Sequence, residues 1–230
     1  MNLSHWDRFA SLAFIAWIWM FNSLMLGCAR HDQAPGSQSH TEGFYLSSSR
    51  WPTHEITVCW ESGGDDGTNG QEARGWVKDA VTSQYNAFTP LRLTGWQSCD
   101  ALSQGANVRV AVADVGPHTI GLGRQIDHKP NGMILNFTFE TWSPSCQSNR
   151  ESCVRSIAVH EFGHAVGMAH EQNRADRPAD CTDAPQGGDG DITVGAFDRH
   201  SVMNYCNPVY NNDGKLSDGD RNTISQAYAH

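Results

Sequence analysis

The chain has 230 residues, of which 39% are hydrophobic and 18% are charged. This length and composition suit one folded domain, or two small ones, with a proper buried core. The 16 basic and 25 acidic residues give a formal net charge of -9, and the basic residues form no cluster. Because neutralising phosphates requires a basic patch, we expect no nucleic-acid partner. The composition also excludes collagen, coiled coils and a fully disordered chain.

The N-terminus predicts export. Residues 9–26 form one long apolar run shortly after Arg8, and the chain turns polar after Cys28. Such a run at an N-terminus is typical of an export signal, which we assign to residues 1–27. The junction before Cys28 resembles that of a bacterial lipoprotein signal, in which the cysteine becomes the lipidated first residue. Ordinary cleavage followed by secretion, and an uncleaved anchor, are the alternatives.

The cysteine count favours the lipid anchor. There are seven cysteines, and an odd number in an exported protein leaves one thiol to explain. With Cys28 as the lipid carrier, the others can form three disulfides in an oxidising compartment. Membrane contact would then occur only through this anchor, on a cell-envelope lipoprotein; without the lipid the protein would be secreted. The pairs that we expect are Cys59–Cys99, Cys146–Cys153 and Cys181–Cys206.

The rest of the sequence predicts a tether followed by one folded domain. Residues 28–50 are rich in Ser, Gly and Gln, which is typical of a tether, and the domain covers residues 51–230, its fold beginning near Phe44 or Trp51. Apolar periodicity predicts helices over 73–88 and 150–168. A last helix begins at Ser217, with Asp220 as capping-box partner. Alternation and turn signals predict strands at 56–60, 91–94, 108–113, 120–126 and 133–139. This order predicts one α+β domain.

The segment 160–170, HEFGHAVGMAH, carries the chemistry. His160 and His164 are four residues apart, so on a helix both imidazoles leave the same face. Gly167 can end that helix by taking a left-handed conformation, and the chain then brings His170 towards the same point. Three neutral histidines leave a fourth position for water, as in catalytic zinc sites. The sequence therefore predicts one zinc ion bound by His160, His164 and His170.

Glu161 indicates an enzyme. Its carboxylate stands beside the first histidine, where it can take the proton of a zinc-activated water that attacks a carbonyl. We therefore expect a zinc-dependent endopeptidase with Glu161 as general base. The alternative is a non-catalytic, zinc-stabilised binding or adhesion lipoprotein, which would have no need of Glu161.

The sequence around and after this segment resembles a known family. Residues 170–177, HEQNRADR, are similar to the continuation of the zinc motif in astacins, a family of the metzincin metallopeptidases. Residues 201–205, SVMNY, resemble the metzincin Met-turn, which places a methionine beneath the zinc site. Residues 216–228 resemble the last helix of the family, and residues 132–142 resemble the strand before the zinc helix in matrixins, a sister family. Ala169 and Asn204 depart from the astacin pattern.

The resemblance implies a metzincin-like zincin domain: a twisted, mixed five-stranded sheet with a long zinc helix and a C-terminal helix. It also implies that Tyr205 is both a zinc ligand and a catalytic residue, because the similar astacin tyrosine ligates zinc and swings away when substrate binds. A protein or peptide substrate would add as an antiparallel strand to an edge strand near residues 120–125. We expect a monomer.

Two further groups of residues, four aspartates and three histidines, are weaker candidates for binding a metal ion. Matrixin relatives bind calcium, and a Gly-rich loop here carries four aspartates. Their spacing does not fit an EF-hand-type loop, which favours a solvated loop over a calcium site. These aspartates are Asp180, Asp183, Asp189 and Asp191. Three histidines have no second potential ligand at a suitable spacing in the sequence and are expected on the surface: His118, His128 and His200.

Overall fold

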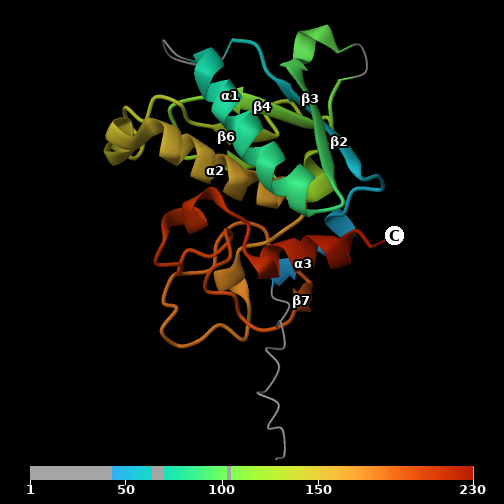
Figure 1. Cartoon of the computed structure of the whole chain (residues 1–230), viewed down its shortest axis with the longest axis vertical. Helices are drawn as coiled ribbons and strands as arrows, with labels where there is room; N and C mark the ends of the chain where they lie inside the picture. Colours follow the sequence, from blue (N-terminus) through green and yellow to red (C-terminus); the bar gives the residue numbers. More distant parts are fainter. Residues whose placement is uncertain (1–42, 64–69, 103–104, 230) are drawn as a thin grey trace, which may run out of the picture. The chain divides into compact units, whose positions relative to one another are not determined.

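The structure, a computed structural model, describes residues 43–63, 70–102 and 105–229 (Figure 1). The export signal predicted at residues 1–27 and the lipid predicted on Cys28 lie outside these residues and stay predictions. Among the residues that are described, no helix is both long enough and apolar enough to span a bilayer.

The first half of the described chain contains a mixed five-stranded sheet. Its strands lie in the order β3-β2-β4-β6-β5. The first four of these are parallel, whereas β5 pairs antiparallel with β6 at one edge. The predicted α+β class and the five-stranded mixed sheet are therefore confirmed. The strands are β2 (Glu55–Trp60), β3 (Arg92–Ser98), β4 (Val108–Val112), β5 (His118–Thr119) and β6 (Met133–Leu135).

Three α-helices and a second, two-stranded sheet complete the described fold. The α-helices are α1 (Gly70–Val81), α2 (Arg150–Ala165) and α3 (Asp218–Ala227), and a π-helical segment, Thr82–Asn86, continues α1. The small sheet pairs β1 (Gly43–Tyr45) antiparallel with β7 (Ile192–Val194). Short 3-10 helices lie at Ser47–Ser49, Cys99–Ala101, Gly123–Ile126, Pro144–Asn149, Glu171–Asn173 and Tyr210–Gly214.

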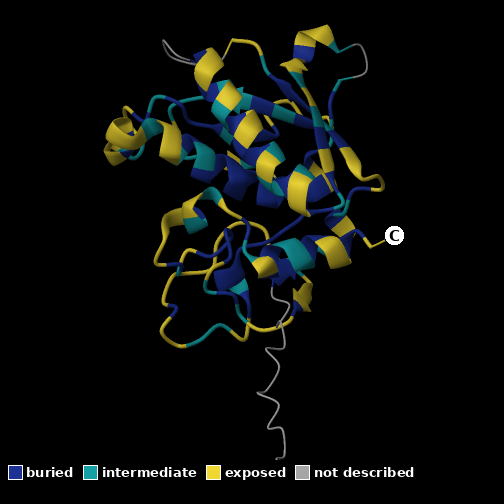
Figure 2. Cartoon of the chain, in the orientation of Figure 1, coloured by how far each residue is buried: buried dark blue, intermediate teal, exposed yellow. Residues whose placement is uncertain are grey.

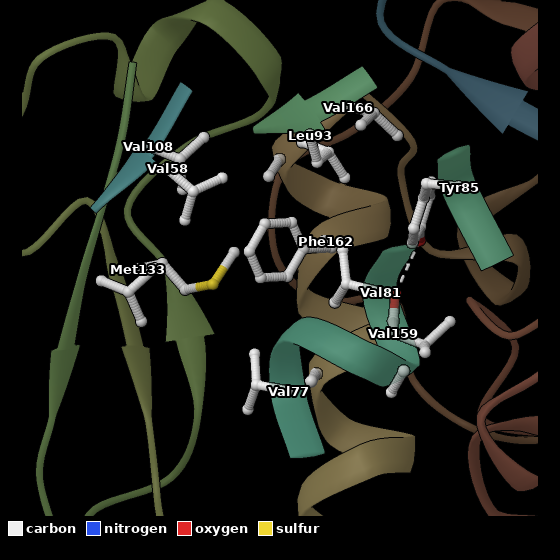
Figure 3. Packing of buried hydrophobic residues seen from close by; sticks show 14 of the residues in the cluster. Val58, Val77, Val81, Tyr85, Leu93, Val108, Met133, Val159, Phe162 and Val166 are labelled. Atoms are coloured by element: carbon white, nitrogen blue, oxygen red, sulfur yellow. Dashed lines mark hydrogen bonds between the residues drawn. The ribbon is translucent and has the colours of Figure 1, made fainter. Parts of the chain in front are cut away.

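Helix α2 is packed between the sheet and the segments that follow the helix (Figure 1). Phe162 and Val159 face the sheet and α1, among fully buried side chains such as Val77 of α1 and Met133 of β6 (Figure 3). The hydroxyl of Tyr85 donates a hydrogen bond of 2.6 Å to the carbonyl of Val159. Burying one such apolar side chain stabilises the fold by about 1.5–3 kcal/mol. The helix that carries the HExxH motif is thereby held rigidly.

The C-terminal half of α2 is buried on all sides. Every residue from Ser156 to Ala165 is buried, and Figure 2 shows this stretch in dark blue. The last carbonyls of a helix have no partner within it, and here two aromatic side chains supply one. The indole of Trp51 donates to the carbonyl of Ala165 at 2.7 Å, and the hydroxyl of Tyr228 donates to that of Val166 at 2.9 Å. Gly167 follows with a positive φ of 96°, as predicted.

The predicted strand at residues 120–126 is wrong. Only His118–Thr119 is extended, and Gly123–Ile126 forms a 3-10 helix. Gly123 has a positive φ of 49°, and a Cβ there would collide with the carbonyl oxygen of Ser49. The chain therefore turns at this glycine and packs against a segment far earlier in the sequence, which alternation of side chains does not reveal.

The other predicted boundaries shift by smaller amounts. Strand β6 ends at Leu135 rather than 139, because the side-chain oxygen of Asn136 accepts hydrogen bonds from the backbone N–H groups of Thr138 and Phe139. Residues 43–50, within the segment expected to be a tether, contain β1 and the buried Phe44, so the described fold begins at Gly43. The capping box of Ser217 and Asp220 is confirmed.

All three predicted disulfides are present. Cys59–Cys99 joins β2 to the segment after β3, Cys146–Cys153 joins the 3-10 helix before α2 to the first turns of α2, and Cys181–Cys206 joins the acidic loop to the residues after Tyr205. Cross-links of this kind stabilise mainly by restricting the unfolded chain. The third one fixes a long loop beside the Met-turn, where little secondary structure would hold it.

The predicted Met-turn lies against α2. Met203 is fully buried, and a Cβ on Gly163 would collide with its sulfur. The carboxylate of Asp220 holds the turn by accepting hydrogen bonds from the hydroxyl of Ser201, at 2.6 Å, and from the N–H of Val202, at 2.9 Å. The first turn of α3 therefore anchors the segment beneath the motif helix.

We predict that Gly163→Ala lowers the free energy of unfolding by about 1–3 kcal/mol, because the new methyl group collides with Met203. Met203→Ala leaves a cavity and costs about 2–5 kcal/mol. The double variant should be destabilised by about 1 kcal/mol or more less than the sum of the two single variants, because removing the Met203 side chain relieves the collision. Denaturant unfolding of the metal-free protein measures all three.

The control for this cycle is Gly75→Ala in α1. A Cβ at Gly75 meets nothing within 4 Å among the described residues, so this change should stabilise by about 0.5–1 kcal/mol through helix propensity. Strict additivity of Gly163→Ala and Met203→Ala would show that the close contact carries no energetic weight.

Candidate active site

Three histidines converge at the C-terminal end of α2. His160 and His164 leave the same face of the helix, and His170 reaches them after the turn at Gly167. The Nε2 atom of His170 lies 3.2 Å from the Nε2 atoms of both His160 and His164. All three side chains are buried, and within the described ranges they form the one group of His, Cys, Asp or Glu that could hold a metal ion.

Each imidazole is oriented by a backbone carbonyl. The Nδ1 atom of His160 donates to the carbonyl of Val202 at 2.8 Å, and that of His164 donates to Met168 at 2.9 Å. The Nδ1 atom of His170 donates to Gln186 at 2.9 Å. Because a carbonyl oxygen can only accept, every Nδ1 carries the proton and every Nε2 presents a lone pair.

This arrangement fits a zinc ion. The Nε2 lone pair of His170 faces those of His160 and His164 at 3.2 Å with no proton between them, so a cation is needed to make the two contacts favourable. Tetrahedral zinc with bonds of about 2.0–2.1 Å separates its nitrogen ligands by roughly 3.3 Å, which agrees with the spacing here. Imidazole nitrogen is also a preferred zinc donor.

Burial keeps the three histidines neutral. Desolvation, assisted by the neighbouring His170, lowers the pKa of His160 to about 3. The same causes, with His160 added, take the pKa of His164 well below its usual value, and burial lowers that of His170. A metal ligand must be deprotonated, so these side chains need not lose a proton at neutral pH before they coordinate.

Glu161 lies beside the triad with one unused oxygen. The residue is 5% exposed, and its Oε2 atom is buried without a hydrogen-bond partner among the described residues. Burial raises the pKa of this carboxyl to about 8. Burying a polar atom without a hydrogen-bond partner costs free energy. Because Glu161 lines two cavities, its Oε2 atom is a candidate to bind a ligand or a water.

Tyr205 covers the triad from the Met-turn. Its ring centroid is 4.7 Å from that of His170 and 5.6 Å from that of His160. The side chain is 42% exposed, and burial, with a smaller contribution from Glu161, raises the pKa of the phenol to about 12. The hydroxyl therefore keeps its proton at neutral pH and can donate a hydrogen bond.

Two cavities meet at Glu161 and Tyr205. The first, of about 330 Å³, extends from His160 towards Trp142 and Tyr210. The second, of about 470 Å³, runs along residues 117–122, which include β5, and is bounded on its other side by residues 186–188. Together they give an extended chain room on both sides of the triad.

A side-chain clamp that the sequence did not reveal positions the third histidine. Asn173 accepts a hydrogen bond from the N–H of Gln186 and donates one to the carbonyl of Gln186, each at 3.0 Å. That same carbonyl orients His170. Asn173 stands three residues after His170 in the motif's continuation, but the loop that it holds comes 13 residues later, and no local pattern predicts that contact.

None of the weaker candidates joins the triad as a metal ligand within the described residues, although His118 lines the second cavity. His118, His128 and His200 are exposed, as predicted. The four aspartates do not gather: Asp180 pairs with Arg199, and Asp191 accepts from the backbone N–H and hydroxyl of Ser47. Asp183 lines the first cavity instead. A calcium site in this loop stays a prediction.

Comparison with known proteins agrees with this fold and site. The model of the Astacin family of peptidases matches residues 146–181. Two solved structures of myroilysin are similar at 20% identity. One has a TM-score of 0.55 and covers 82% of this chain and 99% of that chain, and the other has a TM-score of 0.50 and covers 84% and 93%. A search of curated proteins finds no match.

The histidine triad, together with the family match over the motif, supports a zinc metalloendopeptidase. More particularly, the chain resembles the Astacin family over residues 146–181, and its fold is similar to that of myroilysin. The matched segment includes residues 170–177 and agrees with the resemblance stated for them, whereas residues 201–205 lie outside it, so their resemblance to the Met-turn stays a prediction.

We predict that Asn173→Ala weakens zinc binding about tenfold or more, because the carbonyl that orients His170 loses its second donor and its loop loses an anchor. Competition with a chromophoric chelator measures the dissociation constant. The matched control is Asn222→Ala in α3, which removes an amide nitrogen without a partner in the described part of the chain. An unchanged affinity in Asn173→Ala would mean that the Gln186 loop holds itself in place.

Proposed function

We propose that this protein is an exported zinc endopeptidase that hydrolyses peptide bonds with Glu161 as general base. The observation that carries the proposal is the convergence of three proton-free Nε2 atoms beside an unpartnered carboxylate oxygen, where two cavities of the described chain meet. The proposed zinc ligands are His160, His164 and His170. Zinc bound there supplies a Lewis acid that acidifies a water and polarises the scissile carbonyl.

Glu161 is the residue proposed to transfer the proton of the attacking water. Burial raises the pKa of Glu161 to about 8, but a cation held by the triad would favour the ionised carboxylate. Its buried Oε2 atom has no competing partner within the described ranges, so it could then accept the proton of the attacking water and return it to the leaving amine. The carboxylate is carried by the same rigid helix as two of the proposed ligands, which fixes its position relative to the reacting carbonyl.

The substrate would bind as an added strand. β5 is the edge strand of the sheet, and one of its sides pairs with β6 while the other borders the second cavity. Main-chain hydrogen bonds to an extended peptide would fix its register without regard to most side chains. The strand proposed to pair with the peptide is His118–Thr119, which lies just before the residues expected from the sequence.

Tyr205 is proposed as a fifth zinc ligand in the resting enzyme and as a donor to the oxyanion during the reaction. Its protonated phenol beside His170, and the anchoring of its backbone N–H by the buried Gln172 at 3.1 Å, support this role. The exposed ring has room to move, whereas its backbone is held.

Export is proposed from the N-terminal apolar run, and the three disulfides support an oxidising compartment. A lipid on Cys28 would anchor a monomeric enzyme to the cell envelope, and secretion is the alternative. A non-catalytic binding lipoprotein is the rival function, against which the unused carboxylate oxygen of Glu161 weighs.

Glu161→Gln should retain one zinc ion and lose peptide hydrolysis, because an amide cannot accept the proton of the water. Casein digestion and elemental analysis of the purified variant test this. The matched control is Glu151→Gln, which alters an exposed carboxylate near the start of the same helix and should leave the rate unchanged. Equal hydrolysis by wild type and Glu161→Gln would support the binding-protein function instead.

Tyr205→Phe should retain zinc, keep KM within a few-fold and lower kcat by about 10²–10³, because it removes a donor that acts in the transition state. Steady-state kinetics with one defined peptide measure both constants. Tyr45→Phe, whose ring lines neither cavity, serves as the matched control. If kcat of Tyr205→Phe equals that of wild type, the ring only packs against the triad.

A further inference from the structure

We propose that the first cavity selects a bulky, uncharged apolar side chain, such as that of Phe or Leu, on a substrate residue that adjoins the scissile bond. This inference rests on the proposed peptidase function. The cavity shares His160, Glu161 and Tyr205 with the reaction centre. A side chain that fills it therefore belongs to a residue next to the bond that is cut.

The inner surface of the cavity is apolar and rigid. Ile157 is buried and lies three residues before His160, on the same face of α2. Trp142 forms another wall, with its ring centroid 6.2 Å from that of the buried Phe139 and its Nε1 atom 3.2 Å from where a Cβ on Gly116 would lie. These walls are held by the core and do not need to form around a ligand.

Tyr210 supplies an exposed aromatic wall. Its side chain is 55% exposed, which is unusual for a large apolar residue, and it stands in the 3-10 helix Tyr210–Gly214 that packs on α2. An exposed aromatic ring at the edge of a cavity becomes buried when an apolar side chain enters. The volume of about 330 Å³ is enough for an aromatic side chain.

Two of the amide side chains in the lining already have hydrogen-bond partners within the protein. Asn204 donates to the carbonyl of Asp198 and accepts from the N–H of Cys206. Asn207 donates to the carbonyl of Ser201 and accepts from the N–H of Val209. These amides therefore direct their hydrogen bonds into the protein, and a polar substrate side chain would give up its water without gaining a partner from them.

The charges in the cavity disfavour acidic substrates. Glu161 and Asp183 are its acidic lining residues, and no Lys or Arg of the described chain lines it. A carboxylate that entered the cavity would therefore lose its water without gaining a cationic partner from the lining. Asp183 is exposed to solvent, so water screens its attraction for a basic side chain more strongly than it would in the buried part of the cavity. Apolar contact therefore decides the preference.

The test uses the zinc-loaded enzyme and a set of peptides that differ at one residue beside the scissile bond: Phe, Leu, Ala, Lys or Asp. We expect kcat/KM for Phe and Leu to exceed that for Ala by about tenfold or more, with Asp the poorest, since apolar pockets discriminate by factors of about 10–200. Isothermal titration of the same peptides into zinc-loaded Glu161→Gln should show the same order in Kd.

Two variants locate the selectivity in this cavity. Tyr210→Ala should lower kcat/KM for the Phe peptide by about tenfold relative to that for the Ala peptide. Ile157→Phe fills the cavity and should shift the preference towards Ala. The matched control is Phe88→Ala, which removes an exposed aromatic ring outside the cavity and should change neither peptide. Tyr210→Ala alters an exposed side chain, so its result stands even if Ile157→Phe fails to fold.

The outcomes separate the two proposals. Hydrolysis without a preference for Phe and Leu, or a preference for Lys that Asp183→Asn abolishes, would overturn the cavity inference and leave the peptidase function intact. Selective binding of the Phe and Leu peptides without hydrolysis by wild type would support the cavity and overturn the peptidase function. Neither binding nor hydrolysis would overturn both.

Discussion

The site depends on three hydrogen bonds from imidazole Nδ1 atoms to backbone carbonyls. Each bond fixes a tautomer, and together they turn three lone pairs towards one point. The accepting carbonyls, of Val202, Met168 and Gln186, come from three separate segments that follow α2. The geometry of the metal site therefore requires that these segments be folded correctly, and the histidine spacing on α2 is only part of what positions the ligands.

The remainder of the structure holds those three segments in place. Asp220 at the start of α3 anchors the Met-turn, and Asn173 clamps the Gln186 loop. The segment at Met168 is bound by β1, since the N–H of Ala169 donates to the carbonyl of Phe44 at 2.9 Å and Tyr45 forms a β-bridge with Met168. Segments of low helix and strand content thus acquire the rigidity that a preorganised site needs.

In the proposed function, the two cavities beside the C-terminal end of α2 bind different parts of a peptide. Along the edge strand β5 the cavity offers backbone groups, which recognise any extended peptide. Towards Trp142 and Tyr210 the lining offers rings and aliphatic groups, which recognise one side chain. Glu161 and Tyr205 stand where the two meet, so a peptide bound by both cavities would present one bond to the residues proposed to act on it.

The sequence by itself determined what depends on short spacings. It predicted the three converging histidines, the helix that ends before Gly167, and the capping box of Ser217, because residues a few positions apart are constrained by local geometry. The element order predicted the α+β class, and the family resemblance implied the five-stranded mixed sheet, although the strand expected at 120–126 lies at His118–Thr119. Tertiary structure decided what depends on distant contacts: the turn at Gly123 against Ser49, the carbonyl partners of the imidazoles, and the lining of the apolar cavity. These contacts use backbone groups, or side chains far apart in the chain, so no local pattern of residue types encodes them.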